Sequence, residues 1–285
     1  MNLDMKRIIA LVVALSMPLL MSAQAKIITK KMKIGDFPTK TTKVVMTGNP
    51  FYDGSLQEEM NSRWRISPYE FCSLEEYDRL KTDPSYYFLL TVAGQFKSEN
   101  APGVKMLTLV KGGLGSDKGL DGMFEVITVP LCPAEDPSGR EIVMLPALLD
   151  IVQNYVTDAM ETDLEGYSGL TNYSLNLKKA RRFKIAFAEE DLAAEVDAAV
   201  RAAYIDANME VAEADYVDEY MDSHAPKTLV SYVVAPSGNG EGSYCYKMLI
   251  DAGTHQLYYF RKHKITKKYG VGFLTEDLKK IAASR

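Results

Sequence analysis

The stretch "SLEEYDRLKTDPSYYFLLTV" runs from Ser73 to Val92, and "DYVDEYMDSHAPKTLVSYVV" begins 142 positions later, at Asp215–Val234. The two align without a gap. A helix-capping residue opens each stretch, Pro84 coincides with Pro226, and a run typical of a buried strand closes each. The order of elements, rather than shared letters, indicates that the chain repeats one α/β unit. Two unrelated halves that arrived at the same order are the alternative.

Patterns in the second half predict the elements of this unit. In residues 181–187, "RRFKIAF", apolar side chains recur at every second position from Phe183 to Phe187, which predicts a strand. Apolar residues recur at helical spacing over 189–207, and acids crowd the first turn, so we expect one long amphipathic helix there. Asp215 and Thr275 are expected to cap the next helix and the last one. A Gly-rich turn in between joins two further strands.

The first half follows the same order with its own variations. Pro68 favours an edge position for the strand at 66–72, because proline cannot donate to a sheet ladder. Pro146 is expected in the first turn of the closing helix, where a missing N–H costs least. The faces Phe88/Leu90/Val92 and Val230/Tyr232/Val234 should be equivalent positions of two central strands.

The predicted fold class is therefore α/β (α+β), with two tandem β-α-β-α-β-β-β-α repeats. Each repeat should form a mixed sheet with helices mainly on one face, its first three strands parallel and its last two antiparallel. We expect a separate core in each repeat. The predicted segments are a signal peptide (1–25), a basic lead-in (26–40), repeat 1 (41–162), a Gly-, Ser- and Asn-rich linker (163–180) and repeat 2 (181–285).

The first 25 residues have the three regions of a secretory signal peptide. Lys6 and Arg7 precede an apolar run at 8–21, and Ala23-Gln24-Ala25 matches a small-residue cleavage site. The run is shorter than the roughly 20 residues of a spanning helix, although an uncleaved anchor is the alternative. We expect cleavage after Ala25 and a periplasmic or secreted protein without a later transmembrane span.

Composition and cysteine content narrow the function further. A net charge of −5 argues against nucleic acid as a partner. Cys72, Cys132 and Cys245 allow at most one disulfide in an oxidising compartment, and Cys72–Cys132 is the better pair because both lie in the first half. Three buried thiols are the alternative, and the one we favour.

Catalytic motifs are incomplete throughout the sequence. "GYSGL" at 166–170 lacks the second glycine of a nucleophile elbow, and "GGLGSDKG" at 112–119 lacks the Lys-Ser/Thr pair of a phosphate loop. The three histidines have no metal-ligand spacing and are interpreted as surface or loop residues: His224, His255 and His263. Acid pairs such as Asp218 and Glu219 are interpreted as solvated helix faces. No metal or cofactor is expected.

The repeat resembles a group of periplasmic domains, on the basis of the Ala-rich "DLAAEVDAAVRAA", of "VAEADYVDEYM" and of the hairpin that follows "TLVSYVV". The group comprises the amino-terminal domain of TolB, the LpoB-type activators of penicillin-binding proteins and the CsgG-like secretion proteins. The resemblance spans Lys43–Ala283 and implies non-enzymatic docking or assembly in the cell envelope. The sequence departs from the group in having no lipid-anchor cysteine and no β-propeller after the domain. No functional residue can be carried over, because these domains have no catalytic motif.

A docking function would need aromatic side chains that the core does not use, and the last hairpin offers them. Tyr244, Tyr246 and Met248 should share one strand face; in the partner strand Tyr258 and Phe260 should share one face, and Leu257 and Tyr259 the other. The predicted binding residues are Tyr244, Tyr246, Tyr258, Tyr259, Arg261 and Lys262. We expect some of the tyrosines to be partly exposed, whereas a purely structural role for all four is equally open.

Charge is unevenly distributed along the second half. Residues 189–222 carry many acids and one base, whereas "RKHKITKK" at 261–268 is almost entirely basic. This is either an ordinary solvated surface or a contact for an acidic partner. The function expected is an exported, non-catalytic envelope binding or assembly protein whose partner is an envelope protein or an anionic envelope polymer. A secreted hydrolase or small-ligand receptor with its site in the groove between the repeats is the alternative.

Overall fold

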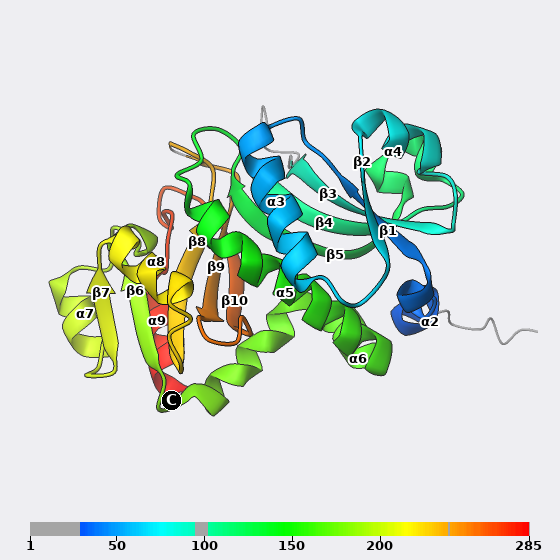
Figure 1. The fold of residues 1–285 in the computed structure, drawn as a ribbon. Helices are drawn as coiled ribbons and strands as arrows, with labels where there is room; N and C mark the ends of the chain where they lie inside the picture. Colours follow the sequence, from blue (N-terminus) through cyan, green and yellow to red (C-terminus); the bar gives the residue numbers. More distant parts are fainter. Residues whose placement is uncertain (1–28, 95–101, 239, 285) are drawn as a thin grey trace, which may run out of the picture.

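The computed structural model describes residues 29–94, 102–238 and 240–284 (Figure 1). The predicted signal peptide therefore lies outside the described residues. The predicted fold class is confirmed: the chain is a mixed α/β protein with two five-stranded mixed sheets, one from each repeat. No helix in the described part of the chain has the length and apolar character needed to cross a bilayer.

Repeat 1 follows a short lead-in and forms sheet A, in the strand order β2-β1-β3-β4-β5. β1 is parallel to β2 and β3, whereas β4 and β5 add antiparallel. The elements are α2 (Lys30–Ile34), η1 (Phe37–Thr39), β1 (Thr41–Val45), α3 (Pro50–Arg63), β2 (Tyr69–Cys72), α4 (Leu74–Leu80), β3 (Tyr86–Gly94), β4 (Val104–Lys111), η2 (Ser116–Lys118), η3 (Leu120–Gly122), β5 (Phe124–Pro133) and α5 (Arg140–Glu161).

Repeat 2 forms sheet B in the equivalent order β7-β6-β8-β9-β10, with the same parallel and antiparallel pairings. The predicted linker is helical: α6 (Asp163–Ser168) and η4 (Gly169–Ala180). The elements that follow are β6 (Lys184–Ala188), η5 (Glu189–Asp191), α7 (Ala198–Tyr204), β7 (Met209–Ala212), α8 (Ala214–Asp222), β8 (Thr228–Val234), β9 (Tyr244–Asp251), β10 (Leu257–Lys264) and α9 (Thr275–Ala283).

The central strands occupy the predicted positions. β3 and β8 lie in the middle of their sheets, and Val230, Tyr232 and Val234 are buried on one face of β8. Phe88 and Leu90 are buried on the equivalent face of β3, where they pack with Tyr77 of α4. The two strands are therefore equivalent in both sheet order and facing.

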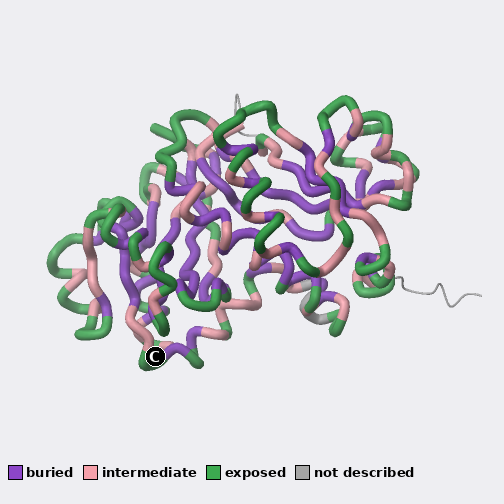
Figure 2. The backbone as a smooth tube through the Cα atoms, in the orientation of Figure 1, coloured by how far each residue is buried: buried purple, intermediate pink, exposed green. Residues whose placement is uncertain are grey.

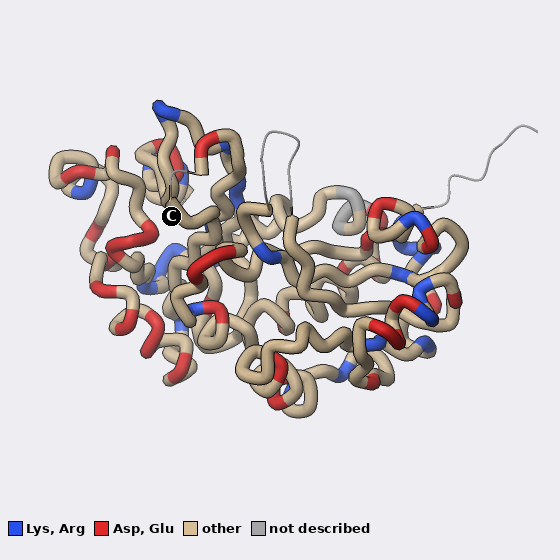
Figure 3. Tube along the Cα trace, turned by 90° about the horizontal axis from the view of Figure 1, so that it is seen from above, with Lys and Arg blue, Asp and Glu red and all other residues tan. Residues whose placement is uncertain are grey.

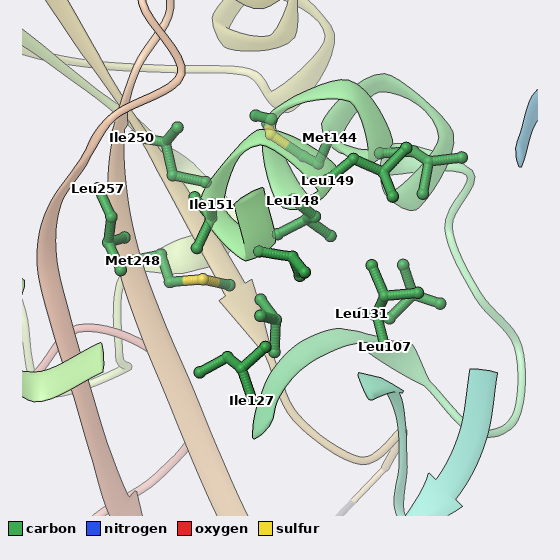
Figure 4. Packing of buried hydrophobic residues seen from close by; sticks show 14 of the residues in the cluster. Leu107, Ile127, Leu131, Met144, Leu148, Leu149, Ile151, Met248, Ile250 and Leu257 are labelled. Atoms are coloured by element: carbon green, nitrogen blue, oxygen red, sulfur yellow. The ribbon is translucent and has the colours of Figure 1, made fainter. Parts of the chain in front are cut away.

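Helix α5 lies between the two sheets and joins their cores. Its residues Met144, Leu148 and Ile151 meet Leu107, Ile127 and Leu131 of sheet A on one side and Met248, Ile250 and Leu257 of sheet B on the other (Figure 4). The buried segments run through both halves (Figure 2). The prediction of separate cores is wrong, because the closing helix of repeat 1 also covers sheet B. Sheet B consequently has helices on both faces, α7 and α9 on one and α8 and α5 on the other.

The long helix predicted over 189–207 is wrong: only Ala198–Tyr204 is α-helical. Upstream, Phe273 N donates to Asp191 O (2.7 Å) and Ala193 N donates to Phe273 O (3.0 Å). These bonds occupy backbone groups that a helix would need. Gly272 makes the approach possible, since a Cβ there would lie 2.6 Å from Ala193 N. The helical periodicity of the sequence is overridden by contact with a loop about 80 residues away.

Of the other predicted helix starts, one agrees with the structure and three are displaced. Ser73 caps α4 as predicted, by accepting from Glu76 N at 3.1 Å. Asp215 lies inside α8, which begins at Ala214, and Thr275 is the first residue of α9 rather than its cap. Pro146 lies inside α5, not in its first turn, because α5 begins at Arg140.

Candidate functional site: the groove between the repeats

A groove of about 630 Å³ lies where the two repeats meet. Its walls come from β3, β4 and β5 of sheet A, from the start of η4, and from Tyr246, Phe260 and Lys262 of sheet B. Lys30 and Tyr155 close one side. This volume is within the range of roughly 300–1,000 Å³ that is usual for binding sites in proteins. The groove depends on both repeats, since neither sheet alone supplies its lining.

One wall of the groove is the outer edge of β5. Among the described residues β4 is the only strand that pairs with β5, and Glu125–Thr128 and Pro130 line the groove. At the next residue, Leu131, the edge is no longer free, because the Tyr232 hydroxyl donates a hydrogen bond to the Leu131 carbonyl. Within the described part of the chain, the backbone of Glu125–Pro130 makes hydrogen bonds only with β4. Such an edge presents N–H and C=O groups to which another chain can pair.

The equivalent edge in repeat 2, that of β10, is covered by η4. Ser174 Oγ accepts from Phe260 N and donates to Phe260 O, both at 3.0 Å. Asn176 Nδ2 donates to Leu257 O at 3.2 Å. Side chains of a segment that the sequence predicted as a linker therefore occupy the hydrogen-bonding groups of this edge. The two repeats differ here, and the β5 edge is the one that borders a groove.

Charge in the groove is balanced. Lys30 Nζ donates to the Tyr155 hydroxyl at 2.9 Å and lies 5.1 Å from the centroid of that ring. Burial lowers the pKa of Lys30, and the carboxylate of Glu125 opposes this effect. Lys262 is exposed at the other end, and Asp121 and Glu125 are exposed on the sheet A side. Two cations and two anions favour a ligand without large net charge.

A buried ionic network around Arg140 fixes the two sheets relative to each other. Arg140 Nε and Nη2 donate to the Asp218 carboxylate, each at 2.9 Å, Nη1 donates to Asp191 Oδ1 at 3.1 Å, and Nη2 also donates to Ser231 O at 3.1 Å. Burial would lower the pKa of the guanidinium, but Asp191 and Asp218 hold it above its usual value. Burial also raises the pKa of Asp191 despite its contact with Arg140. Arg140 opens α5 of repeat 1, whereas its partners all belong to repeat 2.

The sequence interpretation of Asp218 as a solvated helix residue is wrong. Asp218 is 5% exposed, because α8 turns it inward beside Val217. The partner that satisfies it is 78 positions away in the chain. No local pattern in the sequence marks such a pair.

The structure brings two of the six predicted binding residues into the groove, Tyr246 and Lys262. Tyr244 is partly exposed beside them, with the Lys262 ammonium 5.3 Å from the centroid of its ring. Tyr258 and Tyr259 lie on the opposite face of sheet B, in the apolar cluster that contains α9. The predicted set therefore combines residues from both faces of this hairpin, and their role in binding stays a prediction.

A β-bulge between Leu257 and Tyr259 explains the mixed faces. The extra residue reverses the alternation, so that Leu257 and Phe260 face the main core while both tyrosines between them face α9. The predicted pairings of Tyr258 with Phe260 and of Leu257 with Tyr259 are therefore wrong. Of the four tyrosines, some of which were expected to be partly exposed, Tyr244 is partly exposed and Tyr246, Tyr258 and Tyr259 are buried.

Arg261 is paired and does not extend into the groove. Its guanidinium contacts Glu276 at 2.7 Å and Asp277 at 2.9 Å. Asp277 is fully buried and also accepts from Lys247 and, at 2.6 Å, from the Tyr259 hydroxyl. Burial would raise the pKa of Asp277, but Lys247 and these hydrogen bonds hold it below its usual value. This cluster fastens α9 to sheet B on the face away from the groove.

The three cysteines are free and buried, as in the favoured alternative. Cys72 lies on β2 and Cys132 on β5, at opposite edges of sheet A. Four strand spacings of about 4.8 Å separate these edges by about 19 Å, far beyond the roughly 7 Å limit between bridged Cα atoms. The predicted Cys72–Cys132 disulfide is therefore wrong.

Two of the three histidines lie together, with the ring centroids of His224 and His255 5.5 Å apart, whereas His263 lies on β10, its Nε2 2.8 Å from Gly270 O. His255 lies in the β9–β10 turn but is buried, with Nδ1 2.7 Å from Asp150 Oδ2 of α5. His224 is exposed. Within the described ranges no cluster of three or more His, Cys, Asp or Glu side chains is arranged to hold a metal ion.

Comparisons with known proteins found no match: no family model, no curated protein and no solved structure is similar to this chain. The resemblance to the TolB, LpoB-type and CsgG-like domains stays a prediction.

Proposed function

We propose that this chain is an exported, non-catalytic binding or assembly protein of the cell envelope, and that its groove holds an extended segment of a partner protein. The segment would add as a strand to β5. The observation that supports this proposal is the difference between the repeats: η4 covers the β10 edge through Ser174 and Asn176, whereas the equivalent β5 edge lines a groove.

Strand addition matches the chemistry of the groove walls. Backbone hydrogen bonds to Glu125–Val129 and to the Pro130 carbonyl would supply affinity without regard to sequence, and alternate side chains of the partner would supply specificity. Tyr246 and Phe260 face the groove from sheet B and Val92 from sheet A, so alternate apolar residues would find apolar walls. The balanced charge favours a neutral protein segment over an anionic polymer.

The envelope location rests on the predicted signal peptide and on the resemblance. It is tested by cell fractionation together with amino-terminal sequencing of the mature chain. The expected result is a periplasmic or secreted protein that begins at Lys26. A full-length chain that begins at Met1 and stays in the cytoplasm would contradict this part of the proposal.

The groove is tested with bulky residues at two exposed positions of its lining, Ala93→Trp and Thr171→Trp. Ser62→Trp on α3 is the matched control, because Ser62 is exposed and lies outside the groove. We expect all three variants to melt like the parent. Affinity capture from envelope extract should keep the same partner with Ser62→Trp and lose it with either groove variant.

Unchanged capture by both folded groove variants would place the docking surface elsewhere. Loss of capture with Ser62→Trp as well would show that the assay reports general damage. Retention of a small molecule rather than a polypeptide by the parent protein would favour the alternative function, a small-ligand receptor.

A further inference from the structure

A second cavity, of about 550 Å³, lies along residues 172–179 of η4, whereas the groove borders residues 169–171. It is bounded by the carboxyl-terminal half of α5, by residues 172–179 of η4 and by the β9–β10 turn at Gln256 and Leu257. We call it the polar pocket. Its lining shares no residue with the groove, so its function is independent of the proposed docking of a partner protein.

Two polar side chains of the polar pocket are held in place by the protein. The Tyr173 hydroxyl donates to Asp158 Oδ2 at 2.6 Å. Asn176 donates its amide N–H to Leu257 O at 3.2 Å, which leaves its Oδ1 as an acceptor. These contacts orient a carboxylate and an amide oxygen in advance of any ligand.

Three further side chains supply unused hydrogen-bonding capacity. The side chains of Asn154, Lys179 and Gln256 line the pocket, and none of them makes a hydrogen bond with the described residues. Each amide can donate and accept at once, whereas the lysine only donates. Ile151 and Leu257, both buried, also line the pocket and provide apolar surface beside these polar groups.

This combination selects a class of ligand. Neighbouring hydroxyl groups on a sugar ring both donate and accept, so side-chain amides and carboxylates match them, and the C–H face of the ring suits aliphatic surface. The charged side chains of the pocket are Asp158, Glu161 and Lys179, which gives a net charge of −1 and disfavours anions. We infer that the polar pocket binds a neutral saccharide.

The test is titration of the folded protein with neutral linear hexasaccharides of glucose and of N-acetylglucosamine, followed by calorimetry or by chemical shifts. Oligogalacturonate, an acidic oligosaccharide, is the charged comparison. We expect saturable binding of at least one neutral probe and weaker binding of the acidic one. Asn154→Ala and Gln256→Ala should each weaken binding roughly tenfold, because each removes a hydrogen-bonding group from the ligand.

Both residues are exposed, so neither change should affect folding. Lys262→Ala, in the groove, is the matched control and should leave saccharide binding unchanged. The inference is overturned if no neutral probe binds at millimolar concentration. It is also overturned if binding persists unweakened in the folded Asn154→Ala/Gln256→Ala double variant, or if the acidic probe binds more tightly than the neutral ones.

Discussion

Replacement of Arg140 by methionine tests whether the two repeats form one cooperative unit. The change keeps an apolar stem but leaves Asp218 and Asp191, 5% and 2% exposed, without their cation. Breaking a buried ion pair by removing one partner costs about 3–5 kcal/mol. For a chain of this size that corresponds to a fall in Tm of about 6–20 °C. Thermal and urea unfolding, followed by circular dichroism, measure the effect.

The matched control is Arg201→Met. Arg201 pairs with Glu189, which is exposed, and such a pair contributes about 0–1 kcal/mol. The triple variant Arg140→Met/Asp191→Asn/Asp218→Asn should recover much of the loss, because it removes the buried charges as well. The reasoning is refuted if Arg140→Met and Arg201→Met melt alike. It is also refuted if the parent unfolds in two separate transitions, since α5 packs into both sheets.

Three further predictions concern single side chains. Val230→Ala and Leu90→Ala should each cost about 1–4 kcal/mol in urea unfolding, because each leaves a cavity in a central strand; parent-like midpoints would refute the strand assignment. The pKa of Asp277 is lowered by folding, so its contribution to stability is present above about pH 4 and is lost as the pH falls through the folded-state pKa. As the pH is lowered, the urea midpoint of Asp277→Asn should therefore fall less than that of the parent protein. An equal fall in both proteins would contradict this prediction. Ser174→Ala should speed amide exchange along β10, whereas Thr171→Ala should not; equal exchange in both would mean that Ser174 does not protect that edge.

Features set by short-range patterns could be predicted from the sequence. The order of elements along both repeats, the capping by Ser73 and the burial of Val230 follow from alternation, caps and proline placement within a few residues. The charge contrast was also readable: acidic segments dominate the end of the molecule that carries α7 and β7 (Figure 3). The sequence did not show whether this charge contrast contributes to binding.

Features set by contacts distant in the chain could not be predicted. The loop at Phe273 takes the backbone of Asp191 and Ala193 out of a helix that local propensity favours. One extra residue in the bulge between Leu257 and Tyr259 places Tyr259 on the same face as Tyr258, which regular alternation does not predict. Ser174 lies in a segment whose composition is typical of a linker, yet its hydroxyl binds a strand edge 86 positions away. For these reasons the sequence did not show which face of sheet B each predicted binding residue occupies.

Amide hydrogen exchange along β5 tests the central claim, that this edge accepts an added strand. In the free protein, amides of Glu125–Val129 that face away from β4 should exchange faster than those on the η4-covered edge of β10. With the captured partner bound, these β5 amides should become protected, and β10 should not change. The account is contradicted if the β5 amides exchange equally in both states while another surface gains the protection.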